Sequence, residues 1–285
     1  MRFFKLTAVI FCAILLKQFC YQKTDGFALY KIQSKLAFHP EWEVDCSHEN
    51  LDSLIDQRYY YLAKGAQSYV FASEDGKTVI KFFRIYHLTP PLWVTGLSLP
   101  IYLQPYKVHK MMEKEQELAK DFESYALAYN ELKEETGLLY LHLNKTGHLR
   151  KKLTIVDKIG IAHAIDLDQM EFLVQKKATL IFPSIEQLVR EESIDAAKQA
   201  VSNLVQLLVC RCDKGLFDKD PDLNTNFGFI GTIPVQIDIG RFRRQGENKN
   251  NRDEISRITD NFRQWLDQKY PSLSEHLEQE LRKIP

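Results

Sequence analysis

The residues best suited to chemistry lie between Asp218 and Asp238, where carboxylate and amide side chains are frequent. Asp218 and Asp220 precede Asn226, and Asp238 follows a predicted strand over residues 233–237. Carboxylate and amide oxygens are ligands that Mg²⁺ prefers, and a carboxylate can also accept a proton from a hydroxyl group. An Asn and an Asp separated by a short hairpin can converge on one metal. Because Asp and Asn also favour turns and helix caps, a surface turn is the alternative interpretation.

A second candidate lies earlier in the chain, in a predicted hairpin. Ala63, Gly65 and Ser68 place small residues before Val70, and Lys81 follows in the next predicted strand. Small side chains let a backbone approach a phosphate closely, although Ala and Ser allow less conformational freedom than Gly. Taken alone, the pattern also fits an exposed hairpin with a surface lysine.

Together these residues resemble the protein kinase superfamily, over about residues 59–241. In that family, a glycine-rich loop covers the ATP phosphates, and a lysine on the third strand pairs with the phosphates and with a helix glutamate. Ala63, Gly65 and Ser68 stand at the three glycine positions, so only the middle glycine is kept. The resemblance implies that Gly65, Ser68 and Lys81 bind the nucleotide, and that ATP and Mg²⁺ are the cofactors.

The second half of the resemblance concerns the catalytic loop. Aligned on the family's HRD and DFG motifs, Asp220 stands at the catalytic aspartate, Asn226 at the metal-binding asparagine and Asp238 at the main magnesium ligand. Asp218 replaces the histidine, and one extra residue separates Asp220 from Asn226. The register is therefore open, with Asp218 as the alternative base and Asn224 as the alternative ligand.

The resemblance also implies a glutamate partner for Lys81 on the long predicted helix. Glu123 and Glu131 are the two candidates. We expect Glu123, because its position leaves more helix before the next strand, while a solvated helix charge is the alternative interpretation. Residues 241–252 after Asp238 are short and polar and contain no Ala-Pro-Glu motif. This end resembles the atypical small-molecule, lipid or sugar kinases more than the serine/threonine protein kinases.

The elements that must position these residues follow from periodicity and turn signals. An antiparallel hairpin with an Asp75-Gly76 turn, two later strands, a long helix and a helix capped by Ser193 are predicted. Two more helices follow, separated at Pro271. The ranges are 59–71 and 78–84 for the hairpin, 110–137 for the long helix, 153–157 and 172–175 for strands, and 253–270 for the first of the last helices. We therefore expect an α+β, two-lobed protein kinase-like fold, with a β-rich N-lobe over residues 59–176 and a mainly helical C-lobe over 177–285.

The beginning of the chain predicts a hydrophobic helix over residues 1–22, followed by an extension over residues 23–58. Residues 6–16 carry no charge and follow a basic start, a pattern typical of a signal peptide. No small-residue cleavage pattern follows, so we expect an uncleaved single-pass membrane anchor rather than a removed secretion signal. The predicted localisation is membrane-anchored or secreted.

Composition limits the functional classes. Lysine plus arginine and aspartate plus glutamate each number 38, so no overall charge favours nucleic acid. Two functions remain: an ATP- and Mg²⁺-dependent phosphotransferase acting on an unidentified hydroxyl acceptor, and a membrane-anchored pseudokinase that binds nucleotide or a protein partner without catalysis. The incomplete glycine pattern and the lost histidine favour the second, whereas Lys81, Asp220, Asn226 and Asp238 favour the first.

Overall fold

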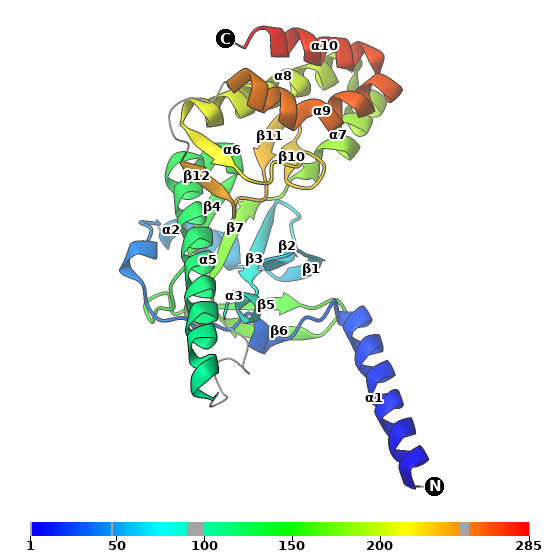
Figure 1. The fold of residues 1–285 in the computed structure, drawn as a ribbon. Coiled ribbons are helices and arrows are strands. Elements are labelled where there is room, and N and C mark those ends of the chain that lie inside the picture. Colours follow the sequence, from blue (N-terminus) through cyan, green and yellow to red (C-terminus); the bar gives the residue numbers. More distant parts are fainter. Residues whose placement is uncertain (1, 47, 90–99, 245–250, 285) are drawn as a thin grey trace. The chain divides into compact units, whose positions relative to one another are not determined.

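The computed structural model describes residues 2–46, 48–89, 100–244 and 251–284. Helices and strands are mixed along the chain, which confirms the predicted α+β class (Figure 1). The chain divides into two compact units: residues 1–118 with 142–174, and residues 119–141 with 175–285. The predicted two-lobed kinase arrangement and its lobe boundaries stay predictions.

The first unit is built on a sheet whose strands follow the order β7-β3-β2-β1-β5-β6. Their bounds are β1 Tyr59–Lys64, β2 Ser68–Ser73, β3 Thr78–Phe83, β5 Lys152–Val156, β6 Ala162–Asp166 and β7 Phe172–Lys176. The predicted Asp75-Gly76 turn joins β2 to β3, and Gly76 has a φ of 71° there, a conformation that glycine adopts without steric cost. The predicted strand over 59–71 is two strands, because the chain turns at residues 65–67.

The N-terminal extension packs on this sheet. The Phe27 ring lies edge-on to Tyr69, with 5.2 Å between centroids, and to Phe71, at 5.5 Å. The Tyr69 hydroxyl donates to the Gly26 carbonyl at 2.8 Å, and the Ser34 N–H donates to the Gln169 carbonyl at 2.9 Å. The remaining helical segments here are α2 His48–Ile55, α3 Ile85–Leu88, and the 3₁₀ turns Leu29–Lys31, Pro40–Trp42, Ile101–Leu103 and Leu167–Gln169.

The prediction of a single-pass anchor over residues 1–22 is wrong. This segment forms helix α1, Arg2–Thr24, but of the residues described here, no helix is long and apolar enough to cross a membrane. Lys5 and Lys17 limit the uncharged run to residues 6–16. At about 1.5 Å per residue that run measures about 17 Å, against a hydrocarbon core of about 30 Å.

The second unit is mainly helical. Helix α5, Gln104–Glu131, begins in the first unit and ends in the second. The other elements are α6 Lys133–Thr136, β4 Leu138–His142, β8 Thr179–Leu180, α7 Ile181–Gln187, the π-helix Leu188–Glu192, α8 Ile194–Asp213, β9 Leu216–Asp218, β10 Phe227–Ile230, β11 Ile233–Gln236, β12 Phe242–Arg244, α9 Asn251–Lys269 and α10 Pro271–Arg282. The strands pair as β11-β10-β8 and β12-β9.

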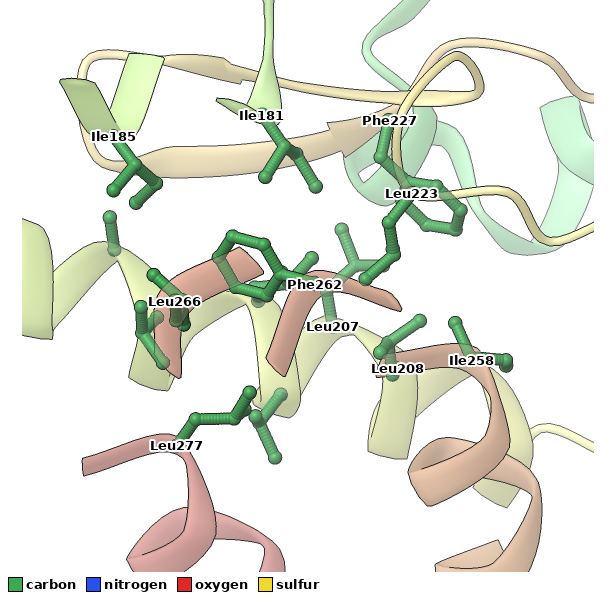
Figure 2. Close-up of a cluster of buried hydrophobic side chains, with 14 of the residues drawn as sticks. Ile181, Ile185, Leu207, Leu208, Leu223, Phe227, Ile258, Phe262, Leu266 and Leu277 are labelled. Carbon is green, nitrogen blue, oxygen red and sulfur yellow. The ribbon is translucent and has the colours of Figure 1, made fainter. Parts of the chain in front are cut away.

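Helix α8 is central to the core of this unit because one of its faces is apolar throughout. Ser193 caps the helix as predicted, and its side chain accepts a hydrogen bond from the Ala196 N–H at 3.1 Å. Figure 2 shows side chains of α7, α9 and α10 converging on α8. Leu223, from the loop between β9 and β10, is 3% exposed and joins the same cluster. The core therefore fixes the loop that carries the candidate catalytic residues.

Candidate functional site

The small-residue segment of the first unit forms a tight turn, which we call the Gly65 turn (residues 64–68). The Gly65 N–H donates to the Ser68 carbonyl at 2.9 Å. Arg84 Nη1 donates to the Gly65 and Ala66 carbonyls at 3.0 and 2.8 Å. A Cβ on Gly65 would lie 3.5 Å from the Ser68 carbonyl oxygen, an ordinary contact. The turn therefore does not need glycine for its own conformation.

Lys81 lies on β3 directly opposite Val70 of β2, and Ser68 lies opposite Phe83. Because side chains alternate along a strand, Ser68, Val70 and Lys81 share one face of the sheet. Lys81 is half-buried. The structure thus places Ser68 and Lys81 on a common face, with Gly65 in the turn that precedes it.

In the second unit, the loop over residues 218–226, which we call the Asp218 loop, begins in a buried carboxylate. Asp218 is 2% exposed, and burial raises the pKa of its carboxyl group. Its Oδ1 accepts from the Asp220 N–H at 2.9 Å, and its Oδ2 accepts from Gln236 Nε2. Because Asp218 is buried and its two oxygens accept these bonds, it is better placed to position the loop than to contact a substrate.

Gln236 connects Asp218 to a buried arginine. Arg211, on α8, is 1% exposed and donates from Nη1 to Gln236 Oε1 at 3.0 Å. Burial lowers the pKa of Arg211, and the Asp218 carboxylate opposes that shift. The side-chain amide therefore has its acceptor toward the cation and its donor toward the anion. A buried charge pair bridged in this way fixes the geometry of the loop, whatever its net effect on stability.

Hydrogen bonds link the other three candidate residues, Asp220, Asn226 and Asp238. Asn226 is 9% exposed and donates from Nδ2 to the Asp220 carbonyl at 2.6 Å. Its own carbonyl accepts from the N–H groups of Ile237, at 2.8 Å, and Asp238, at 3.3 Å. Asp220 and Asp238 are both exposed. The β10–β11 hairpin thus returns the backbone of Asp238 to the side of Asn226, and a ligand shared by the two side chains stays a prediction.

The loop has donors for Mg²⁺, although few of them. Among the described residues, no three His, Cys, Asp or Glu side chains form a group that could hold a metal. Protein-bound Mg²⁺ commonly uses one or two protein carboxylates and takes its other ligands from phosphate and water. Asp238 offers a carboxylate that accepts a hydrogen bond from the Gly240 N–H at 3.4 Å. Asn226 Oδ1 accepts from Thr225 Oγ1 at 2.9 Å and keeps a second lone pair.

The segment after Asp238 is held by the C-terminal part of α5. Ser124 Oγ donates to the Ile239 carbonyl at 2.5 Å and accepts from the Phe242 N–H at 2.6 Å. Arg241 pairs with Asp220 at 3.1 Å, Arg243 lies 4.0 Å from Asp121, and Arg244 pairs with Glu131. These arginines hold the chain in place, and each has a carboxylate beside it.

Glu123, the predicted partner of Lys81, is exposed on α5, whereas Asp121 on the same helix is half-buried. Close to Asp121, the pKa of the buried Tyr125 hydroxyl is raised by burial and then by the carboxylates of Asp238 and Asp121. Asp121 and Asp238 therefore both act on the same buried hydroxyl group.

Sequence reasoning missed the supporting residues Arg211, Gln236 and Ser124. One signal was present for Arg211, a charged residue that continues the apolar face formed by Leu204, Leu207 and Leu208 on α8. A cation on the buried face of a helix must find a partner inside the core. Gln236 and Ser124 carry no comparable signal.

No protein-family model and no curated protein matches the chain. Similar solved structures include WbdD with the kinase inhibitor LY294002, at 14% identity and a TM-score of 0.36, covering 79% of this chain and 46% of that one. A structure described as the bifunctional kinase-methyltransferase WbdD has 17% identity and a TM-score of 0.32, covering 77% and 43%. The Rv3197–erythromycin complex from Mycobacterium tuberculosis has 14% identity and a TM-score of 0.32, covering 77% and 53%.

This chain therefore spans between 43% and 53% of these longer proteins. The similarity is a distant one to structures that include a kinase. TM-scores this low carry no argument about function, which must come from the residues themselves.

Proposed function

We propose that the protein is an ATP- and Mg²⁺-dependent phosphotransferase of the atypical kinase-like type. In this proposal, Lys81 contacts phosphate oxygens beside the Gly65 turn and Ser68, and Asp238 and Asn226 bind the magnesium ion. Asp220 accepts the proton of the acceptor hydroxyl group, and Asp218 positions the loop. Phosphoryl transfer relies mainly on positioning and charge stabilisation, which these residue types supply.

One observation carries the proposal: the Asp218 loop assembles Asp220, Asn226 and Asp238 around a buried charge pair. The Asn226 carbonyl accepts from the Asp238 N–H, and its side chain donates to the Asp220 carbonyl. Meanwhile Asp218 and Leu223 hold the loop from inside. A surface turn rich in Asp and Asn would need neither a buried carboxylate nor a core leucine. Preorganised acidic groups are typical of catalytic sites.

A nucleotide-binding protein without catalysis is the second candidate, and two contacts favour it. Arg84 occupies both carbonyls at the Gly65 turn, and Arg241 pairs with Asp220, the proposed base. The ion pair with Arg241 also occupies the Asp220 carboxylate that would have to reach the acceptor hydroxyl group.

Turnover separates the two candidates. We expect wild-type protein to release ADP from ATP in the presence of Mg²⁺ and an acceptor. Asp220→Asn should keep ATP affinity within about twofold while lowering turnover by a factor of about 10² to 10⁴, the range for removing a positioned acid–base group. The control is Asn130→Ala, a substitution at an exposed position of α5. Tight Mg²⁺-dependent ATP binding without turnover, with every acceptor tried, would select the non-catalytic candidate.

A further inference from the structure

A pocket of about 220 Å³ lies beside Asp220, within the second unit. Its wall includes residues of the Asp218 loop, of α7 and of α9. The residues that line it with a polar side chain or an aromatic ring are Phe182, Asp220, Asp222, Asn224, Arg257 and Asn261. We propose that this pocket binds the phosphoryl acceptor, and that the acceptor is a neutral sugar residue with adjacent free hydroxyl groups. The inference rests on the function proposed above, in which Asp220 is the base.

The size of the pocket selects a small ligand. Pockets for drug-sized ligands occupy about 300–1,000 Å³. At about 220 Å³, this pocket is smaller, so one ring with its substituents fits better than a nucleotide or a peptide segment.

The polar groups of the pocket match the hydrogen bonding of hydroxyl groups. A sugar hydroxyl both donates and accepts, so it needs acceptors and donors side by side. Asp220 and Asp222 supply carboxylate acceptors, and Arg257 supplies donors. Asn224 and Asn261 are exposed, and within the described ranges neither side-chain amide has a recorded partner, so both remain able to donate and accept.

The charges of the pocket disfavour an anionic acceptor. Arg257 is its cation, and Glu254 binds that guanidinium through Nε at 3.1 Å and Nη2 at 2.9 Å. Asp220 pairs with Arg241 and Arg257 pairs with Glu254, so the carboxylate of Asp222 leaves the pocket with a net negative charge. A phosphorylated or carboxylated acceptor would be repelled, whereas an uncharged hydroxyl-rich ring is not.

Phe182 supplies an apolar wall for the carbon face of the ring. It is half-buried, and its ring lies edge-on to Phe262, at 5.6 Å between centroids, and to Trp265, at 4.8 Å. These contacts fix the orientation of the ring before any ligand arrives. A rigid aromatic wall with a few directed polar groups is typical of small-molecule sites.

The reaction is balanced with groups already named. Asp220 takes the proton from one sugar hydroxyl as its oxygen forms a bond to the γ-phosphorus of ATP. The bond from that phosphorus to the β,γ-bridging oxygen breaks, and ADP leaves with the electron pair. The products are a sugar phosphate, ADP and a proton released from Asp220 to solvent.

Saturation-transfer NMR on the full chain tests binding apart from turnover. The probes are methyl α-glycosides of glucose, mannose and galactose, oligosaccharides ending in the same sugars, and the charged analogues glucosamine and glucuronate. We expect at least one neutral glycoside to bind, and Asn261→Ala and Arg257→Gln to weaken binding by about tenfold, as for the loss of a hydrogen bond to the ligand. Asn130→Ala is the matched surface control. Binding of an oligosaccharide alone would identify the end of a glycan as the source, and binding of the simple glycoside would identify a free sugar.

Three results would overturn the inference. The first is that no neutral glycoside binds while ATP binds with Mg²⁺. The second is equal glycoside affinity in wild type and Asn261→Ala, and the third is preferential binding of glucosamine or glucuronate. Each leaves the proposed phosphotransferase intact. Absence of ATP binding would instead refute the proposed function, and the glycoside titration would still decide whether the pocket binds a sugar.

Discussion

Exchanging the side chains of Asp218 and Gln236 tests how the Asp218 loop is held. Two donors end this buried chain of hydrogen bonds, Arg211 Nη1 at one side and the Asp220 N–H at the other. Between them, the Gln236 amide accepts from Arg211 and donates to Asp218, and Asp218 accepts twice. With asparagine at position 218, every orientation of the two amides leaves one donor facing another donor. Asp218→Asn also removes the anion nearest to the buried Arg211.

The magnitude follows from these contacts. An unsatisfied buried group costs about 1–3 kcal/mol, and a buried charge without its partner costs about 3–5 kcal/mol. We therefore expect Asp218→Asn to lower the free energy of unfolding of the second unit by about 3 kcal/mol, a fall in Tm of about 10 °C. Gln236→Glu alone places two carboxylates side by side and should cost a similar amount.

The double variant Asp218→Asn with Gln236→Glu restores both the buried negative charge and the pattern of hydrogen-bond donors and acceptors. Arg211 then donates to the new carboxylate at position 236, the new amide at position 218 donates to the same carboxylate, and the oxygen of that amide accepts from the Asp220 N–H. A residual cost of about 1 kcal/mol remains, because the donor from Gln236 to the Asp238 carbonyl at 3.3 Å is lost. Urea denaturation followed by circular dichroism measures the cycle, and amide hydrogen exchange in α8 assigns the loss to this unit. Single variants within about 0.5 kcal/mol of wild type, or additive effects in the double variant, would refute the reasoning.

Three further predictions concern other parts of the molecule. Burial raises the pKa of Glu171 from 4.5 to about 7, so its contribution to stability is full below about pH 4.5 and is lost as the pH rises through 7. Relative to Glu171→Gln, wild type should lose about 3 kcal/mol of unfolding free energy over that window. Parallel pH profiles of the two proteins in urea denaturation would exclude this. Gly228→Ala should destabilise the second unit by about 1–3 kcal/mol, because the new Cβ would lie 2.6 Å from the Thr179 carbonyl oxygen. The midpoint of urea denaturation measures the effect, and an unchanged midpoint would show that β8 moves away freely. Gly65→Ala should keep Tm within about 2 °C of wild type, because a Cβ fits in the Gly65 turn at ordinary contact distance. Any loss of ATP affinity in that variant then reports on contact with phosphate. A large fall in Tm would contradict the geometry of the turn.

Local signals predicted most of the elements. The Asp75-Gly76 turn and the Ser193 cap lie where their residue types require, because both depend only on neighbouring backbone groups. The break of the hairpin at residues 65–67 was missed although Gly65 marks it, because the aromatic residues on both sides, up to Tyr61 and from Tyr69, suggested one continuous strand. The prediction of a membrane span at residues 1–22 assumed that Lys5 and Lys17 reach the two membrane interfaces, since the uncharged run between them covers only residues 6–16.

The assignment of the candidate site residues stays a prediction, and their spacing accounts for part of the geometry observed. Asp220, Asn226 and Asp238 were chosen by spacing, and the β10–β11 hairpin explains why that spacing brings Asn226 beside Asp238. The choice between Asp218 and Asp220 could not be made from sequence, because it depends on the burial of Asp218 beside Gln236, which residue spacing does not reveal. Glu123 could likewise not be distinguished from the other acidic residues of α5 before its exposure was known.

Calorimetric titration of ATP into wild type and Asp238→Ala, each with and without Mg²⁺, tests the central claim most directly. Asp238 offers its carboxylate beside Asn226, so we expect Mg²⁺ to increase the ATP affinity of wild type by at least about tenfold, and Asp238→Ala to abolish that increase. The Mg²⁺-free affinity should be the same in both proteins. Wild-type affinity that is unaffected by Mg²⁺ and unchanged in Asp238→Ala would contradict the assignment of the metal site and, with it, the proposed phosphotransferase.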